Sequence, residues 1–390
     1  MQATVSARPL PQRMPGIDAL RGLSVLLVAL HHIHLRFVLN HFDVTTLLPK
    51  AAGRVVFWSG YYAVIAFFVI SGFLITTLSL RRWGTLPTIS LRQFYRLRLA
   101  RIGPCLLALV IILAILHSAG VANFVIDPNR ATLGRAILAA LTFHLNWLEG
   151  TRGYLPGNWD VLWSLSIEET FYLVFPLACI VLRRERLLLL PIALLICIGP
   201  IARVLAADRE PWSEYAYLAC MDGIAFGCLA ALVAHRFNLQ DRTLRYIGGI
   251  GIAAIALIVV TRETADQLGL VASGLYITVL EFGVAAALLA LSRVRFDSLL
   301  SRSTRWLQFV GRASYEIYLT HMFVVFAFID LFKRTTSDLQ NYWAWYALML
   351  AASVALGYAV ARWFSEPLNR ALRRGTASTT ASQPAAVSNN

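Results

Sequence analysis

Several ionisable side chains lie inside apolar stretches of this sequence. The first stretch holds Asp18, Arg21 and His32, with Arg21 and His32 eleven residues apart. On a helix this spacing is about three turns, so both side chains face one way about 16 Å apart along the axis. Ionisable groups at membrane depth tend to be functional, and an imidazole there can act as a base or a nucleophile. Alternatively, Asp18 and Arg21 lie at the interface and His32 is a hydrogen-bonded core residue.

Two adjacent carboxylates, Glu168 and Glu169, follow Trp163, Ser164 and Ser166 about ten residues into another apolar stretch. At that depth a carboxylate is costly unless it is paired, protonated or hydrated. This favours a functional site. The alternative is that the helix begins later and the two residues cap it at the interface.

Counting depth along the helices places these groups in one layer. At ~1.5 Å per residue, His32 lies about 22 Å from one membrane edge and Glu168 about 13 Å from the other, in a core of roughly 30 Å. Asp222 and His321 reach similar depths, and Glu281 lies a little deeper. The layer indicates a hydrated cavity. Transporters build such layers too, so it names no chemistry by itself.

A basic cluster precedes Pro104 and comprises Arg92, Arg96, Arg98 and Arg101. Guanidinium groups suit phosphate, so the cluster fits capture of a phosphorylated donor molecule. It equally fits control of membrane topology or contact with anionic lipid.

The apolar stretches must position these groups. Of 390 residues 58% are hydrophobic and 14% charged, which is typical of a bundle of membrane helices. We expect an all-α, polytopic bundle of about ten transmembrane helices, at residues 17 to 38, 55 to 80, 101 to 118, 161 to 182, 187 to 206, 213 to 236, 245 to 261, 269 to 291, 306 to 332 and 342 to 364. Residues 132 to 148 form an eleventh candidate, either a full span or a re-entrant piece.

Charge favours ten spans. If residues 132 to 148 do not cross, most arginine-rich links share one side, and the positive-inside rule places both termini in the cytoplasm. We therefore expect a cytoplasmic tail at 1 to 15, a membrane domain at 16 to 366 and a basic, then disordered, cytoplasmic tail at 367 to 390. The net charge of +14 reflects topology rather than nucleic-acid binding. The five cysteines lie in or beside apolar runs and predict no disulfide framework, and no cleavable signal peptide is expected.

Taken together, these motifs resemble acyltransferase family 3, integral membrane enzymes that move acyl groups onto polysaccharides, antibiotics and other acceptors. The resemblance covers nearly the whole bundle. It rests on Ile17 to Arg21 followed by His32, Phe67 to Ile75, the Arg98, Arg101 and Pro104 motif, Trp163 to Tyr172 with Pro176, the Gly311, Ser314, Tyr315, Tyr318 and His321 motif, and Glu366 with Pro367. The sequence departs from the family pattern at Ala19, His31, Thr170 and Thr320.

The resemblance implies a bacterial inner-membrane enzyme that transfers an acyl group, most often acetyl, from acyl-CoA to a hydroxyl of a carbohydrate or lipid-linked glycan. No permanent cofactor or metal is expected. His32 would be the base or nucleophile, with Glu168 or Glu169 orienting it. Arg21, Arg98 and Arg101 would bind the donor. Supporting roles would fall to Asp18, Ser71, Trp163, Ser166, Asp222, Tyr318 and His321. The rival function is a transporter or flippase that uses the same groups as a proton relay.

Overall fold

The computed structural model describes residues 13–295, 297–335 and 342–374, and these residues form helices and turns without a strand. Eight helical segments are long and apolar enough to cross a membrane, and two further apolar helices of 17 residues reach the lower limit for a span. The helices in these segments are α1 (Pro15–Val38), α3 (Gly60–Trp83), α4 (Leu91–Ser118), α8 (Leu162–Leu182), α9 (Leu189–Leu205), α11 (Tyr217–Arg236), α12 (Asp241–Val259), α14 (Leu275–Leu291), α17 (Ser314–Thr335) and α18 (Tyr342–Val360). The predicted polytopic helical bundle is confirmed.

Short helices connect the long ones. They are α2 (Lys50–Phe57), α5 (Leu133–Leu141), α6 (Leu145–Arg152), α7 (Gly157–Asp160), α10 (Trp212–Tyr215), α13 (Arg262–Gln267), α15 (Leu299–Ser303), α16 (Arg305–Arg312) and α19 (Glu366–Arg374), with 3₁₀ turns at Val44–Leu47 and Leu86–Thr88 and a π-helical turn at Ala361–Ser365. The expected N-terminal tail lies largely outside the described residues. So does the disordered part of the C-terminal tail.

The eleventh candidate segment is divided between two short helices. The nine residues of α5 rise only about 13 Å, well under the thickness of a bilayer core. Thr142 ends α5, and Phe143 has a positive φ of 59°, so the chain turns before α6 begins. Residues 132 to 148 therefore form no single spanning helix, as the charge pattern favoured.

Facing glycines let the central helices approach closely. Gly72 of α3 lies against the backbone of Ile224 on α11, and Gly227 of α11 lies against the backbone of Val69 on α3. A Cβ atom at either glycine would collide with a carbonyl oxygen. Small residues at such crossings are how membrane helices gain van der Waals contact where lipid supplies no hydrophobic driving force. As a result α3, the most buried of the long helices, forms the centre of the bundle.

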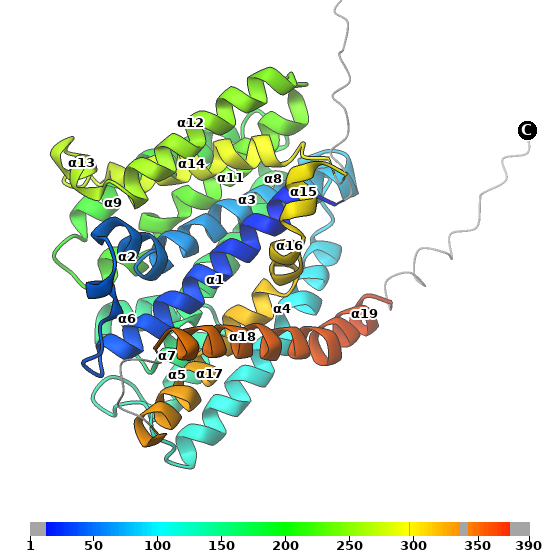
Figure 1. Ribbon diagram of the computed structural model, residues 1–390. Helices are drawn as coiled ribbons and strands as arrows, with labels where there is room; N and C mark the ends of the chain where they lie inside the picture. The colour runs from blue at the N-terminus through cyan, green and yellow to red at the C-terminus, as the bar shows by residue number, and fades with distance from the viewer. Residues whose placement is uncertain (1–12, 296, 336–341, 375–390) are drawn as a thin grey trace, which may run out of the picture.

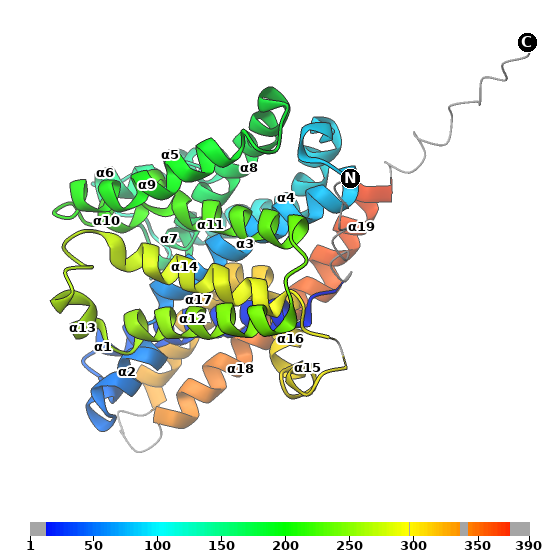
Figure 2. The ribbon, with the colours of Figure 1, turned by 90° about the horizontal axis from the view of Figure 1, so that it is seen from above.

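The views from two sides show how the helices surround this centre. In Figures 1 and 2, α3 and α11 lie inside the bundle, with α12 and α18 at its periphery. In Figure 2, α5, α6 and α9 lie on the opposite side from α12 and α18. The short α19 continues beyond α18 and packs against α4. Helices α1, α3, α4, α8 and α17 thus lie close enough to share a site.

Candidate active site

A cavity of about 630 Å³ lies between α1, α3, α4, α8 and α17. Its wall is largely apolar, with Phe67, Leu74 and Leu165 among the lining residues. Arginines from the ends of α3 and α4 and from α19 also line it, and Tyr318 and Ser164 form another part of the wall. An apolar chamber with a cationic rim can hold a molecule that has a phosphorylated head and a thin, largely uncharged arm.

Within the cavity, Glu168 lies beside Ser71 and has the guanidinium groups of Arg98 and Arg21 as charged neighbours. The hydroxyl groups of Ser71 and Tyr172 are hydrogen-bonded at 2.6 Å. The guanidinium carbon of Arg98 lies 4.5 Å from the centre of the Tyr172 ring, which is cation–π geometry. The guanidinium group of Arg98 is therefore held at the cavity wall by the Glu168 carboxylate and the Tyr172 ring.

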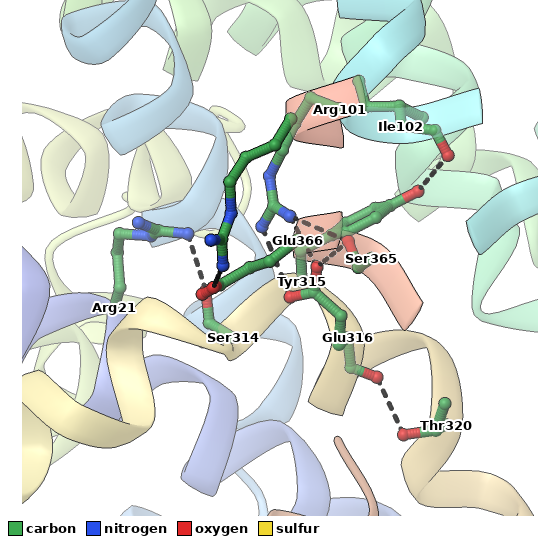
Figure 3. A network of polar contacts seen from close by, with 10 residues as sticks. Arg21, Arg101, Ile102, Ser314, Tyr315, Glu316, Thr320, Ser365 and Glu366 are labelled. Carbon is green, nitrogen blue, oxygen red and sulfur yellow. Dashed lines mark hydrogen bonds and ion pairs between the residues drawn. The ribbon is translucent and has the colours of Figure 1, made fainter. Parts of the chain in front are cut away.

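A second network joins α1, α4 and α17 to the segment after α18 (Figure 3). Arg101 donates to Glu316 Oε1 at 2.5 Å and to Ser365 Oγ at 3.2 Å. Ser365 Oγ donates to the same carboxylate oxygen at 2.6 Å. Arg21 donates to Ser314 Oγ at 2.9 Å. Because Glu316 is buried, Arg101 supplies the charge that makes its burial tolerable.

Two histidines form a pair behind the cavity wall. His32 Nδ1 lies 3.1 Å from His321 Nε2 and 3.0 Å from the carbonyl oxygen of Val28. His321 Nδ1 lies 2.7 Å from the carbonyl oxygen of Tyr318 and 3.2 Å from that of Ile317. Tyr318, whose carbonyl oxygen contacts His321, also lines the cavity. The histidine pair therefore adjoins the cavity without lining it.

Comparison with known proteins decides the family. A family model described as "Acyltransferase domain" matches residues 14–362, almost all of the described bundle. The chain belongs to this acyltransferase family. The family resemblance predicted from the sequence is confirmed, and the protein is an integral membrane protein.

Individual relatives agree with this assignment. The acyltransferase is 25% identical over 338 residues to O-acetyltransferase OatA of Staphylococcus aureus, covering 80% of this chain and 50% of the relative. It is 29% identical over 178 residues to a protein of the same species named "Putative O-acetyltransferase SAS0844", covering 43% of this chain and 25% of the relative. The chain thus spans about half the length, or less, of these curated relatives. No solved structure matches it.

The structure of this acyltransferase brings six of the predicted site residues to the cavity. They are Arg21, Ser71, Arg98, Arg101, Glu168 and Tyr318. His32 and His321 pair behind it. Asp18 forms an ion pair with Arg21 at 3.7 Å, the arrangement that the sequence left open. These residues come from five helices, α1, α3, α4, α8 and α17.

The expected contact of His32 with a carboxylate is not among the contacts of the described residues. The charged neighbours of His32 are His321, His31 and Arg36, whereas those of Glu168 are Arg98 and Arg21. Depth counting treats the helices as perpendicular to the membrane, and helix tilt shifts such levels by a turn or more. His321 holds the place next to His32 that the sequence gave to Glu168 or Glu169.

Three other predicted site residues lie outside the cavity wall. The Trp163 ring stacks on Tyr215 with centroids 4.2 Å apart. Ser166 accepts a hydrogen bond from the backbone nitrogen of Leu145 at 3.2 Å, so it fixes the start of α6. Glu169 is buried next to Glu168 and Arg98 without lining the chamber. Contacts of this kind support the helices rather than a ligand.

Asp222 belongs to a separate charged cluster. It accepts two hydrogen bonds from Arg203 of α9, at 2.7 and 3.1 Å, and both side chains are buried. Arg203 also donates to the carbonyl oxygens of Ala219 and Gly274. Buried Glu281 lies next to Asp222. This cluster ties α9, α11 and α14 together, so Asp222 and Glu281 belong to a group separate from the cavity and the histidine pair.

Sequence reasoning missed several cavity and network residues. Glu316 and Arg203 are single charges in apolar helices, the signal that singled out Glu168, and this criterion would have found both. Ser164 and Tyr172 stand within a recognised motif. A hydroxyl group in an apolar helix costs much less free energy than a charge, so its presence does not by itself indicate a functional site. Arg373 lies beyond the last span, where an arginine is ordinary.

A further cluster of polar side chains lies on the short helices α6, α7 and α10. Tyr215 donates to Asp160 Oδ1 at 2.8 Å, and Arg36, one turn after His32, is a charged neighbour of Asp160. Glu149 of α6 is fully buried, and burial together with the nearby Asp160 charge raises its pKa well above the usual range. Among the described residues, the buried amide of Asn158 has no hydrogen-bond partner. These groups form the polar environment on the far side of the histidine pair.

Proposed function

We propose that this protein transfers an acyl group, most simply acetyl, from acyl-CoA to a hydroxyl of a carbohydrate or glycan-like acceptor. One observation carries the proposal: in a chain of the acyltransferase family, an arginine-rimmed apolar cavity is lined by Tyr318, whose carbonyl oxygen contacts His321 of the His32 and His321 pair. The O-acetyltransferase name of its relative OatA supports transfer of acetyl to oxygen.

The cavity suits a CoA thioester. Arg98 and Arg101 on α4 offer guanidinium groups for its phosphates, and the apolar wall suits the pantetheine arm. Arg98 has the larger share in this proposal, because Arg101 already pairs with Glu316. Arg21 lies with Ser314 in the chamber, where it would contact the donor or its carbonyl.

The hydrogen bonds of the histidine pair determine which nitrogen of His32 is available. The carbonyl oxygens of Tyr318 and Ile317 can only accept, so His321 Nδ1 must carry a proton and donate it. In neutral His321, Nε2 is then an acceptor. His32 Nδ1 faces this nitrogen and the carbonyl oxygen of Val28, so it carries the proton of neutral His32. His32 Nε2 is left with a free lone pair.

That lone pair supports two routes. As a general base, His32 Nε2 takes the acceptor hydroxyl proton while the oxygen attacks the thioester carbonyl, and the departing CoA thiolate then receives the proton. As a nucleophile, Nε2 itself displaces the thiolate, the acyl group then passes from nitrogen to the acceptor oxygen, and the hydroxyl proton goes to the CoA thiolate. In both, His321 Nε2 accepts a hydrogen bond from His32 Nδ1 and stabilises the imidazolium or acylimidazolium, the role that a carboxylate plays in catalytic triads.

The acceptor would approach from the side opposite the arginines. Asp160 and Glu149 lie close to each other, and Arg36, one turn after His32, is a charged neighbour of Asp160. Asn158 belongs to the same short helix as Asp160, and the ring centroids of Tyr154 and Tyr215 are 5.8 Å apart. Amide, carboxyl and aromatic groups of this kind suit hydroxyl-rich molecules. This placement assigns the donor and the acceptor to opposite ends of one site.

We also propose a bacterial inner-membrane location with both termini in the cytoplasm, and the domain limits of 16 to 366. The arginine-rich ends of α3, α4 and α19 then face the cytoplasm, where acyl-CoA is found.

The deciding experiment measures acetyl transfer by the purified, full-length protein in lipid nanodiscs. With ¹⁴C-acetyl-CoA and oligosaccharide mixtures as acceptors, we expect release of free CoA together with labelled, base-labile ester on the acceptor. A transporter or flippase, the alternative function, would release no CoA. Intact acetyl-CoA after incubation, with protein that is folded and binds the donor, would reject the proposal.

A further inference from the structure

The short helix α19 lies beyond the residues that the family model matches, although Glu366 and Pro367 at its start belong to the resemblance noted in the sequence. The family match ends at residue 362, and α19 begins at Glu366 after the π-helical turn. It is held in place by α4, where Arg96 donates to the carbonyl oxygen of Leu372 at 3.2 Å. Figure 2 shows α19 beside the end of α4. The helix therefore has a fixed position at the cavity rim.

From this position α19 contributes Arg373 to the cavity wall. The charged neighbours of Arg373 are Arg101, Arg82 and Arg98, which come from α3 and α4. Among the described residues, the lining set contains six arginines and a single carboxylate, Glu168. The six arginines are Arg21, Arg81, Arg82, Arg98, Arg101 and Arg373. Like charges gathered at one rim repel each other, and a bound polyanion relieves that repulsion.

We propose that α19 is a functional part of the donor site and that Arg373 binds a phosphate of the CoA moiety. The inference rests on the proposed function, because it takes acyl-CoA as the donor. CoA carries a diphosphate and a ribose phosphate, and guanidinium groups bind phosphate oxygens through paired, charge-assisted hydrogen bonds. The C-terminal segment, which the sequence analysis treated as a tail, would then determine affinity for the donor.

The chain offers a matched control on the same helix. Arg370 lies one turn before Arg373, forms an exposed ion pair with Glu366 at 2.9 Å and does not line the cavity. Arg370→Ala removes the same charge from α19 without removing a cavity contact. Arg373→Lys keeps the charge but loses the planar fork.

The test measures binding of CoA, 3′-dephospho-CoA and pantetheine to the full-length protein in nanodiscs of neutral phosphatidylcholine, so that lipid supplies no net charge. Arg373→Ala should weaken CoA binding about tenfold or more, Arg370→Ala less than about twofold, and Arg373→Lys by an intermediate factor. Pantetheine, which lacks the phosphates, should bind wild type and Arg373→Ala equally. A loss seen with CoA alone assigns Arg373 to the ribose phosphate, and an equal loss with 3′-dephospho-CoA assigns it to the diphosphate.

Equal CoA affinity of the folded Arg373→Ala variant and the wild type would overturn the inference and leave the proposed function standing. So would an equal loss in Arg370→Ala, which would reflect bulk charge instead of a contact. If the wild type itself binds no CoA, the donor proposed for the enzyme is wrong and this inference falls with it.

Discussion

At the scale of single residues, the arginines of the cavity have different tasks although they are chemically alike. Arg98 stacks on Tyr172 and lies near Glu168, whereas Arg101 is the ion partner of buried Glu316. A guanidinium that pairs with a buried carboxylate is needed for stability before it is needed for binding. Substitutions at the two positions should therefore separate donor affinity from folding.

Arg101→Ala should destabilise the protein, since it removes the ion partner of the buried Glu316 carboxylate and leaves Ser365 as its hydrogen-bond partner among the described residues. Loss of one partner of a buried pair costs about 3–5 kcal/mol. Thermal unfolding followed with a thiol-reactive dye would measure this, because Cys179, Cys220 and Cys228 are buried. The double variant Arg101→Ala, Glu316→Gln should regain part of the loss. An unchanged melting temperature in Arg101→Ala would show that the pair does not stabilise the fold.

Arg98→Ala should instead raise the apparent KM for acyl-CoA and leave the melting temperature close to wild type. A charge-assisted hydrogen bond to phosphate contributes ~1.5–3 kcal/mol, so an increase of roughly tenfold or more is expected. Steady-state kinetics over a range of acetyl-CoA concentrations would measure it. If KM stays unchanged in correctly inserted protein, Arg98 serves topology only.

The adjacent carboxylates should also differ. Glu168 lines the cavity beside two arginines, and Glu169 does not line it. Glu168→Gln keeps the shape but removes the charge opposite Arg98 and Arg21, so it should lower kcat or raise KM for the donor by about tenfold. Glu169→Gln should have the smaller effect on kinetics. Parallel kinetic and melting measurements on both variants would reveal a reversed order, which would contradict this assignment.

At this scale the sequence predicted which residues line or adjoin the cavity better than it predicted their contacts. His32 and Arg21 were found because a charge in an apolar helix is costly, and a helix has a fixed angular period. The partner of His32 depends on where α17 lies relative to α1, and no local pattern contains that information. His321 was therefore given only a supporting role, and a carboxylate on α8 was expected in its place.

At the scale of helices, the close crossing of α3 and α11 positions the cavity wall. Phe67, Ile70 and Leu74 of α3 line the chamber, and on the helix they lie roughly opposite Gly72, which faces α11. The eight long apolar segments and the two shorter apolar helices could be predicted from apolar run length, because bilayer thickness sets that length directly. The crossings could not, because small residues occur in many positions of these helices and only some of them face a neighbour.

Gly72→Ala should therefore destabilise the bundle, since the added Cβ would collide with the Ile224 carbonyl oxygen. Overpacking at a close contact costs about 1–3 kcal/mol. Gly249→Ala on the peripheral α12 is the control, because no atom lies within 4 Å of an added Cβ there. We expect a lower melting temperature for the first variant and no decrease for the second. Equal melting temperatures would mean that the α3 and α11 crossing can relax.

At the scale of the whole molecule, the site brings together helices from distant parts of the chain. Arginines and Tyr318 line one cavity, the carbonyl oxygen of Tyr318 contacts His321, and His321 contacts His32. Asp160 of α7 has Arg36, one turn after His32, as a charged neighbour. We propose that a cytoplasmic donor and an acceptor from the opposite side both reach His32. The proposal takes ten spans, with both chain ends in the cytoplasm, as the positive-inside rule predicts from the arginine clusters.

The central claim is that His32 performs the chemistry on acyl-CoA held in this cavity. The most direct measurement is the rate of acetyl transfer from ¹⁴C-acetyl-CoA by purified wild type, His32→Ala and His31→Ala in nanodiscs, with CoA binding measured in parallel. General-base or nucleophilic catalysis contributes about 10²–10⁴-fold, so His32→Ala should lose at least about a hundredfold in rate while binding CoA normally. His31→Ala, whose ring instead contacts the Phe57 carbonyl, should retain most activity. Retention of most activity by His32→Ala, or its loss in His31→Ala alone, would contradict the account.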